Sequence, residues 1–305
     1  MLTSEASADL TTEEARAARR VKRAQQAAQA LSFAALLLLF LACSLYLVIV
    51  YTGWNQHTAA GALFCAGLAG YPALALLWFA LSSQMFTCWR AMPTHDRFTW
   101  SQKIPTVTHA VIMTLVGVWV VFFQAWSHDD IIRGRNELVA AFIGLELGYL
   151  VQLVAIEAEK QRRFSQSMLL LNWLHHVSVL LALPWYYKYK LGDFFFGAFF
   201  LMSASTVPMQ CHWFMRTAGL TRGTVVMVNH LLLLLSFLLC RVLLIPYLIW
   251  VYSQNLGINP YQALWAMPWP FACAALSLMA INTAWFFRIL TRPPRQRKGG
   301  RAKAA

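Results

Sequence analysis

The stretch LLLNWLHHVSVLLALP, residues 169–184, decides the fold class, because it is apolar apart from an asparagine, two adjacent histidines and a serine. It lies within an uncharged run from Ser167 to Tyr187, and an α-helix needs about 20 such residues to cross a bilayer. Ionisable side chains are costly at membrane depth and usually face the interior of a helix bundle. His175 and His176 therefore indicate a functional path inside a membrane protein.

The composition of the whole chain supports this class. Of its 305 residues 59% are hydrophobic and only 12% are charged, whereas soluble domains carry about 25% charged residues. Apolar runs of about 20 residues without strict alternation favour helices over a β-barrel. We predict an all-α polytopic membrane protein with about eight transmembrane helices, at residues 31–51, 61–82, 104–126, 137–156, 167–187, 193–213, 223–252 and 265–290.

The net charge of +13 comes largely from two tails, ARRVKR and RPPRQRKGGRAK. Basic residues cluster at the cytosolic ends of membrane helices, so we expect both termini to be cytosolic and no nucleic-acid partner. The final residues RAKAA resemble an endoplasmic-reticulum retrieval signal; that membrane is our prediction and the plasma membrane is the alternative. The six cysteines are scattered without a C-x-x-C pair, and we predict no metal and no resident cofactor.

Polar side chains from six of the predicted helices fall in the same half of the bilayer, at 1.5 Å of rise per residue. A shared depth indicates a polar chamber open toward the cytosol. Asn172, His175 and Ser178 form one stripe of a helix, so we expect His175 to face the chamber and His176 to have an orienting or structural role. The remaining predicted lining residues are His109, Glu146, Gln152, Ser203, Thr206, Gln210, His212, Asn229 and Asn282.

Two buried charges lie deep in the predicted spans. Glu146 and Arg241 would each be expensive alone, so we expect a structural ion pair between them. The alternative is that Glu146 orients a catalytic histidine. A zinc site from His109, His175 and His212 is a further alternative, because zinc accepts three histidines and a water.

Six segments in order carry a family resemblance: WSQKIPTVTHA at 100–110, LGYLVQL at 147–153, LHHVSVL at 174–180, SASTVPMQCHWF at 203–214, the segment from Asn229 through Arg241 to Tyr247, and INTAWFFRIL at 281–290. Together they resemble the TLC domain that ceramide synthases share with other TLC-domain-containing proteins. The resemblance implies a TLC-type barrel of six helices.

We divide the chain accordingly into a basic N-terminal segment (1–30), two transmembrane helices with their loop (31–96), the TLC domain (97–292) and a basic tail (293–305). The family's aspartate after Gly-Tyr is missing, with Gln152 as the nearest polar residue, and its glutamate falls on Ser203. The chain thus looks nearer to the TLC-domain proteins that are not ceramide synthases.

The resemblance implies a role in lipid metabolism, homeostasis or trafficking, in which the chamber holds a membrane lipid, either a sphingolipid or a phospholipid. An acyl-CoA-dependent N-acyltransferase is the alternative. In such an enzyme His175 would accept the acyl group or act as a base. His176 and His109 are the other candidate catalytic residues, and acyl-CoA would be the co-substrate. A basic rim that includes Lys103, Arg162, Arg163, Arg216 and Arg222 would then face the CoA phosphates. A channel or transporter is the third possibility. The sequence does not indicate an oligomeric state.

Overall fold

The helices of this protein begin, in the part that the structure describes, at Thr58. The computed structural model describes residues 58–86, 89–90, 92–126, 130–163, 167–189, 191–220 and 222–291, and gives only the backbone for 58, 95, 130, 159–163 and 167–170. These residues belong to one compact unit, Tyr51–Ala305. They are helical and contain no strand, so the predicted all-α class is confirmed. The predicted span 31–51 lies outside the described residues.

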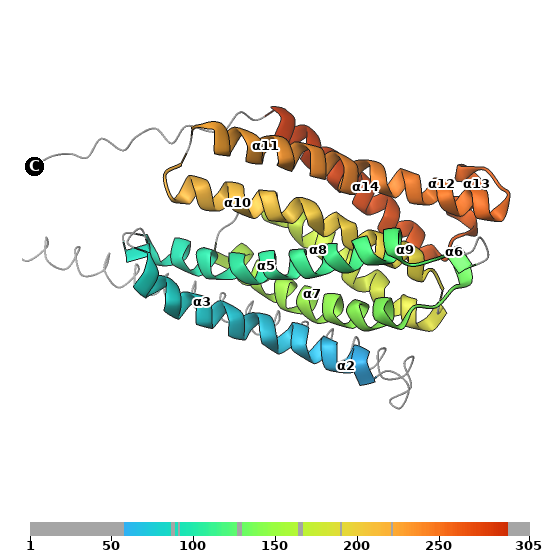
Figure 1. Ribbon diagram of the computed structural model, residues 1–305, viewed down its shortest axis with the longest axis horizontal. Helices are drawn as coiled ribbons and strands as arrows, with labels where there is room; N and C mark the ends of the chain where they lie inside the picture. Colours follow the sequence, from blue (N-terminus) through green and yellow to red (C-terminus); the bar gives the residue numbers. More distant parts are fainter. Residues whose placement is uncertain are drawn as a thin grey trace, which may run out of the picture. The chain divides into compact units, whose positions relative to one another are not determined.

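The long helices lie alongside one another and alternate in direction (Figure 1). In chain order the elements are α2 (Thr58–Cys65), η1 (Ala66–Gly70), α3 (Tyr71–Met85), α5 (Thr94–Val118), η2 (Trp119–Phe123), α6 (Asp130–Arg133), α7 (Glu137–Arg163), α8 (Ser167–Tyr189), α9 (Asp193–Phe200), η3 (Leu201–Ser205), α10 (Thr206–Thr217), α11 (Thr224–Phe237), η4 (Leu238–Leu243), α12 (Leu244–Leu256), α13 (Pro260–Ala266) and α14 (Trp269–Thr291).

Six of the described helical segments are long and apolar enough to cross a membrane, which makes this an integral membrane protein. They are Ala59–Met85, Asp96–Phe123, Glu137–Ala158, Asp193–Thr217, Thr224–Leu256 and Trp269–Thr291. They coincide with six of the predicted spans. The predicted span 167–187 is the 23-residue helix α8, which packs against α7 and α14 but is not among these six.

The alternation of directions gives the bundle two ends. We call the end with the start of α5, the end of α10, the start of α11 and the end of α14 the basic end, because Arg216, Arg222 and Arg288 lie near it. The opposite end carries the starts of α7, α9 and α14. There the carboxylate of Asp193, fully buried, accepts hydrogen bonds from Arg135 Nη1 (3.1 Å), Tyr186 Oη (2.9 Å) and the backbone N–H of Asn136. These bonds join the start of α9 to the segment before α7.

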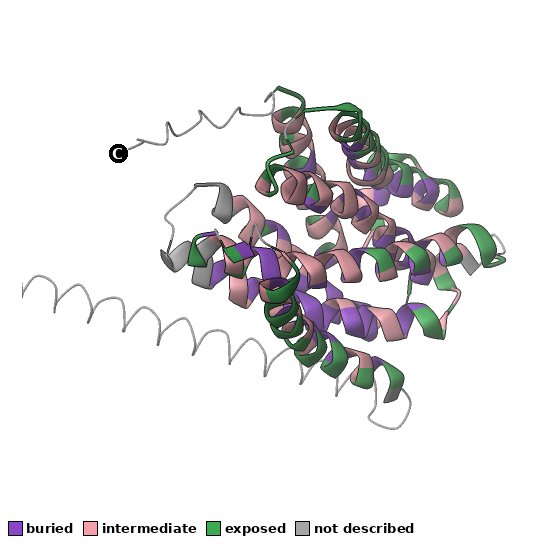
Figure 2. Cartoon of the chain, turned by 60° about the vertical axis from the view of Figure 1, so that its left-hand side comes forward, coloured by how far each residue is buried: buried purple, intermediate pink, exposed green. Residues whose placement is uncertain are grey.

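Helix α7 is the central helix of the bundle. In the most apolar 18-residue stretch of α7, 67% of the residues are buried, against 22–50% in the corresponding stretches of the other five spans. Figure 2 shows the buried residues gathered on the inner helices and the exposed ones on the outer sides. Large apolar side chains such as Leu76, Phe122 and Val225 are exposed there, as expected for a surface that faces lipid acyl chains.

Two glycines of α7 allow a close approach to α2. They form the pattern Gly144-Leu-Glu-Leu-Gly148, a small-xxx-small motif typical of membrane helix contacts. A Cβ on Gly144 would overlap the backbone of Ala60, and one on Gly148 would overlap that of Phe64. The backbones therefore touch here, and this contact sets the position of Glu146, which lies between the two glycines.

Candidate functional site

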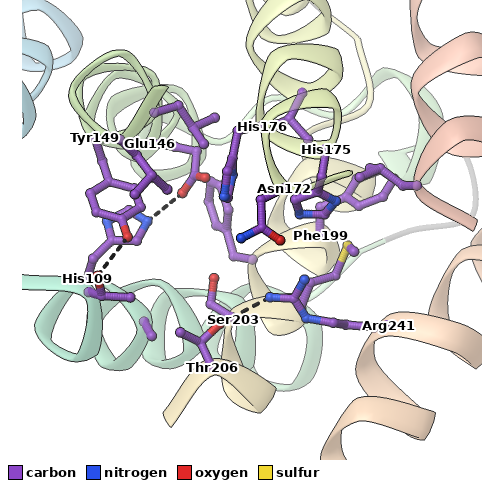
Figure 3. A pocket seen from close by; sticks show the side chains of 18 of the residues that line it. His109, Glu146, Tyr149, Asn172, His175, His176, Phe199, Ser203, Thr206 and Arg241 are labelled. Atoms are coloured by element: carbon purple, nitrogen blue, oxygen red, sulfur yellow. Dashed lines mark hydrogen bonds and ion pairs between the residues drawn. The ribbon is translucent and has the colours of Figure 1, made fainter. Parts of the chain in front are cut away.

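A cavity of about 1110 Å³ lies inside the bundle, lined by α5, α7, α8, the α9–η3–α10 segment, η4–α12 and α14. Figure 3 shows polar side chains on several of these helices lying close together, among them His109, Glu146, Asn172, Ser203 and Arg241. Toward the opposite end its wall is the apolar core cluster that includes Met202, Ile245, Ile249, Ala275 and Leu278. The cavity is thus amphipathic along its length.

Ten of the predicted site residues line this cavity: His109, Glu146, Gln152, Asn172, His175, His176, Ser203, Thr206, Gln210 and His212. They come from α5, α7, α8, η3 and α10, so residues more than a hundred positions apart in the sequence line one cavity. Among the described residues, no group of three or more His, Cys, Asp or Glu side chains is placed to hold a metal ion. His109, His175 and His212 therefore do not converge as a ligand set.

Three predicted lining residues do not line the cavity. The Ser178 hydroxyl donates to the carbonyl oxygen of Leu174 (2.5 Å) in its own helix, which satisfies it locally. Asn229 Nδ2 donates to the Pro208 carbonyl (3.0 Å), and Asn282 Nδ2 donates to the Arg241 carbonyl (3.5 Å). These two amides are used in contacts between helices, because a polar group in hydrocarbon gains most from a backbone partner. The structure does not bring these three side chains to the cavity wall.

His109 has partners on both ring nitrogens. Its Nε2 lies 2.7 Å from Glu146 Oε2, and its Nδ1 lies 3.0 Å from the hydroxyl of Tyr71. In the neutral imidazole Nε2–H donates to the carboxylate and Nδ1 accepts from the tyrosine. The ring also stacks on Tyr149, with centroids 3.8 Å apart, and the Tyr149 hydroxyl donates to Thr106 Oγ1 (3.3 Å). The imidazole is therefore fixed in place and in orientation.

The expected contact between Glu146 and Arg241 is not formed. Glu146 pairs with His109, while Arg241 donates from Nε to Ser205 Oγ (2.6 Å) and from Nη2 to Thr206 Oγ1 (3.1 Å). Depth along the two helices suggested the pair, but rotation about the helix axes places the side chains on different neighbours. Both charged groups still line the same cavity.

His175 differs from His109 in its surroundings. It is buried, and its Nδ1 has no hydrogen-bond partner among the described residues. Its ring lies edge-on to His176 (centroids 5.1 Å apart) and tilted against Trp285 (5.0 Å). Glu146, the residue expected to orient a catalytic histidine, bonds to His109 and not to His175. Gln152, which also lines the cavity, leaves its own Oε1 without a partner in the described part of the chain.

Several polar atoms of the cavity wall are buried without a hydrogen-bond partner among the described residues. They include Gln152 Oε1, His175 Nδ1, Gln210 Oε1, His212 Nδ1 and Trp285 Nε1. Buried polar groups are otherwise almost always bonded. These atoms are therefore the places where polar groups of a ligand would be received.

Tyr71 contacts the site but is not among the residues that the sequence pattern predicts. Tyr71 begins α3, lies before the predicted TLC domain and bonds to His109 across 38 positions of sequence. The one available signal was the Gly70-Tyr71-Pro72 triplet inside an otherwise apolar span. Trp285 was noted only as a residue of the family motif at 281–290, whereas in the structure its ring lies against His175.

The helices and their six apolar spans define a polytopic helical membrane protein. The TLC-domain profile (TRAM_LAG1_CLN8) matches residues 99–291, and the chain belongs to the TLC-domain family, as the motifs predicted.

Similar proteins include TLC domain-containing protein 4-A of Xenopus laevis, 24% identical over 246 residues that cover 74% of this chain and 89% of the relative. TLC domain-containing protein 4 of Homo sapiens is 21% identical over 219 residues, which cover 70% of this chain and 80% of the relative. TLC domain-containing protein 4 of Xenopus tropicalis is 23% identical over 246 residues, with coverages of 74% and 88%. No solved structure matches this chain.

Proposed function

We propose that this protein acts in lipid metabolism, homeostasis or trafficking by holding a membrane lipid or its acyl chain in the interior cavity. The observation that carries the proposal is the amphipathic cavity of about 1110 Å³, since pockets for small ligands usually measure about 300–1,000 Å³. Its apolar half suits a hydrocarbon chain, and its mid-depth polar band suits a head group. A sphingolipid and a phospholipid both have this form.

A second candidate function is acyl transfer from acyl-CoA to an amine, and the bare Nδ1 of His175 favours it. The imidazole nitrogen would attack the thioester carbonyl, the C–S bond would break, and the thiolate would leave as free CoA after taking a proton. The amine would then attack the acyl-imidazole, forming the amide, losing a proton and restoring the histidine. Alternatively His175 would act as a base that takes the proton of the attacking amine.

One experiment tests both functions. The full chain and its His175→Ala variant are purified, bound lipid is extracted and quantified by mass spectrometry, and turnover of acyl-CoA is assayed with sphingoid and lysolipid acceptors. His230→Ala serves as the control, because His230 does not line the cavity. Lipid in near-stoichiometric amount in all three proteins supports lipid holding, and its absence together with no binding of added lipid refutes it.

The same experiment separates catalysis from holding. Acyl transfer that is lost in His175→Ala but kept in His230→Ala, with an acyl adduct on the His175 peptide, supports the enzyme. If the wild-type protein retains lipid but turns over no acyl-CoA with any acceptor, lipid holding is supported and acyl transfer is refuted.

For the location, we propose the endoplasmic reticulum membrane with both termini in the cytosol. Protease protection of terminal tags in isolated microsomes would test this proposal.

A further inference from the structure

We propose that Arg241 forms an anion-binding subsite, so that the lipid held in the cavity carries a negatively charged group, a carboxylate or a phosphate. This inference rests on the proposed lipid-holding function and specifies its ligand class. The anionic group would lie at mid-depth beside Arg241, and the acyl chain would extend toward the opposite end.

The position of Arg241 is the first argument. It lies on η4, a π-helical turn in the middle of the long span Thr224–Leu256, and its side chain lines the cavity. A cation at this depth is costly unless a counter-charge or a water-filled space accompanies it, and such residues usually mark ligand or ion sites. The guanidinium also lies over the ring of Phe237, 5.4 Å from its centroid, which limits the directions it can take.

The second argument is the hydrogen-bond inventory of the guanidinium. It has five N–H donors, of which Nε–H and one Nη2–H are bonded to the hydroxyls of Ser205 and Thr206. Both partners are neutral, so they orient the cation without compensating its charge. The other three N–H donors have no hydrogen-bond partner among the described residues. Among the residues that the structure describes, no carboxylate lies within ion-pair distance of Arg241, and Glu146 is engaged by His109.

The neighbouring wall supplies further polar groups for the same ligand. Figure 3 shows the Asn172 side chain and the Arg241 guanidinium pointing toward one another across the cavity, with Ser203 beside Thr206. A planar guanidinium binds two oxygens of a carboxylate or phosphate at once. An amide and a hydroxyl alongside it provide donors for the remaining oxygen lone pairs.

The apolar wall argues that the anion is part of a lipid. Beyond Arg241 the same helix continues with Ile245 and Ile249, which join Met202, Ala275 and Leu278 in the core cluster that lines the cavity. A free anion has no apolar part, so the apolar wall of the cavity would have no hydrocarbon to contact. A lipid-borne anion would place its hydrocarbon chain there, where burial of its CH₂ groups stabilises the complex.

The test compares lipids that differ only in charge. Binding of oleate and methyl oleate, and of lysophosphatidate and monoolein, to the purified full chain in detergent micelles is measured by displacement of a fluorescent acyl probe. We expect the charged member of at least one pair to bind about 10-fold to 100-fold more tightly. Whether oleate or lysophosphatidate shows the larger preference distinguishes a carboxylate from a phosphate ligand. Inorganic phosphate alone should not displace the probe.

Three variants assign the preference to a residue. Arg241→Gln should reduce the affinity for the charged lipid to that of its neutral partner, and Arg241→Lys should retain part of the preference. Arg133→Gln removes an exposed cation that does not line the cavity and should change nothing. Should Arg241→Gln fail to fold, the wild-type comparison and Arg241→Lys still decide the matter.

The outcomes separate this inference from the proposed function. Equal binding of charged and neutral lipids, or an unchanged preference in folded Arg241→Gln, overturns the anion subsite and leaves lipid holding intact. Displacement by inorganic phosphate without any contribution from the chain overturns the lipid origin of the anion. No binding of any of the four lipids overturns both the subsite and the proposed function.

Discussion

His109 shows how a single residue of this site is constrained. Its two ring nitrogens bond to Glu146 and Tyr71, and its face stacks on Tyr149. A ring held in this way is suited to positioning the helices and the polar wall. His175 instead has a buried Nδ1 without a hydrogen-bond partner among the described residues. The sequence pattern alone had grouped both as candidate catalytic residues.

The contact between His109 and Glu146 predicts strong coupling between the two side chains. His109→Gln and Glu146→Gln should each lower the free energy of unfolding, by up to about 3–5 kcal/mol, because one leaves the partly buried Glu146 carboxylate and the other the buried His109 ring without its partner. The double variant should lose less than the sum, with a coupling energy of at least about 1 kcal/mol. Denaturant unfolding of the purified protein in mixed micelles measures all three. Strict additivity would refute the pair, and the cycle of Glu146→Gln with His230→Gln provides an additive control.

Glu146 and Arg241 show how much of the site could be predicted from the sequence. Helix length and polarity predicted that the two residues lie at similar depths, and in the structure both line one cavity. It did not identify their partners, because depth is one coordinate and the rotation of each helix about its axis is another. That rotation depends on packing, for example on the π-helical turn η4 that carries Arg241, and no hydropathy pattern records such a turn.

Among the elements, α2 and α7 make the closest contact, through Gly144 and Gly148. Gly148→Ala should lower the free energy of unfolding by about 1–3 kcal/mol, because the added Cβ meets the backbone of Phe64, which cannot move aside cheaply. Gly61→Ala is the matched control: it is also in a helix, and its Cβ would meet nothing within 4 Å. It should be neutral or stabilising by up to about 1 kcal/mol. Thermal unfolding in detergent compares the two, and equal effects would contradict the close approach.

Element boundaries were largely predictable. The apolar runs placed six spans that the structure also forms, because burial in lipid demands a continuous helix whatever its neighbours. The short helix α13 was not expected, although Asn259 and Gln262 form a capping box at its start. Short helices outside the bilayer depend on local hydrogen bonds, which a hydropathy profile does not detect.

For the molecule as a whole, the cavity predicts a limit on ligand length. Ala274 lines the apolar part of the cavity, so Ala274→Phe should shift the retained lipids toward shorter acyl chains. Ala280→Phe adds the same volume to an exposed position of α14 that does not line the cavity, and it should leave the chain-length profile unchanged. Mass spectrometry of the extracted lipids gives both profiles. The same shift in both variants, or none in Ala274→Phe, would argue against chain accommodation at this site.

At the same scale, the family and membrane class were predictable from the sequence, whereas the composition of the chamber was only partly so. Several polar residues that line the cavity were proposed from their depth, but Ser178, Asn229 and Asn282, which were proposed in the same way, bond elsewhere. Each of them uses a backbone carbonyl on its own or a neighbouring helix, and such a choice depends on which backbones come within reach in the folded bundle.

The hydrogen bond between Tyr71 and His109 also bears on where this protein can be cut. Tyr71 lies 28 residues before the segment that defines its family, residues 99–291. A polypeptide trimmed to that segment would keep every family motif. It would nevertheless lack the Tyr71 hydroxyl that bonds to His109, and it would lack α2, which Gly144 and Gly148 of α7 contact. A shortened version of this protein should therefore include α2, which begins at Thr58. The segment that matches the family, residues 99–291, is shorter than the set of helices that contact one another.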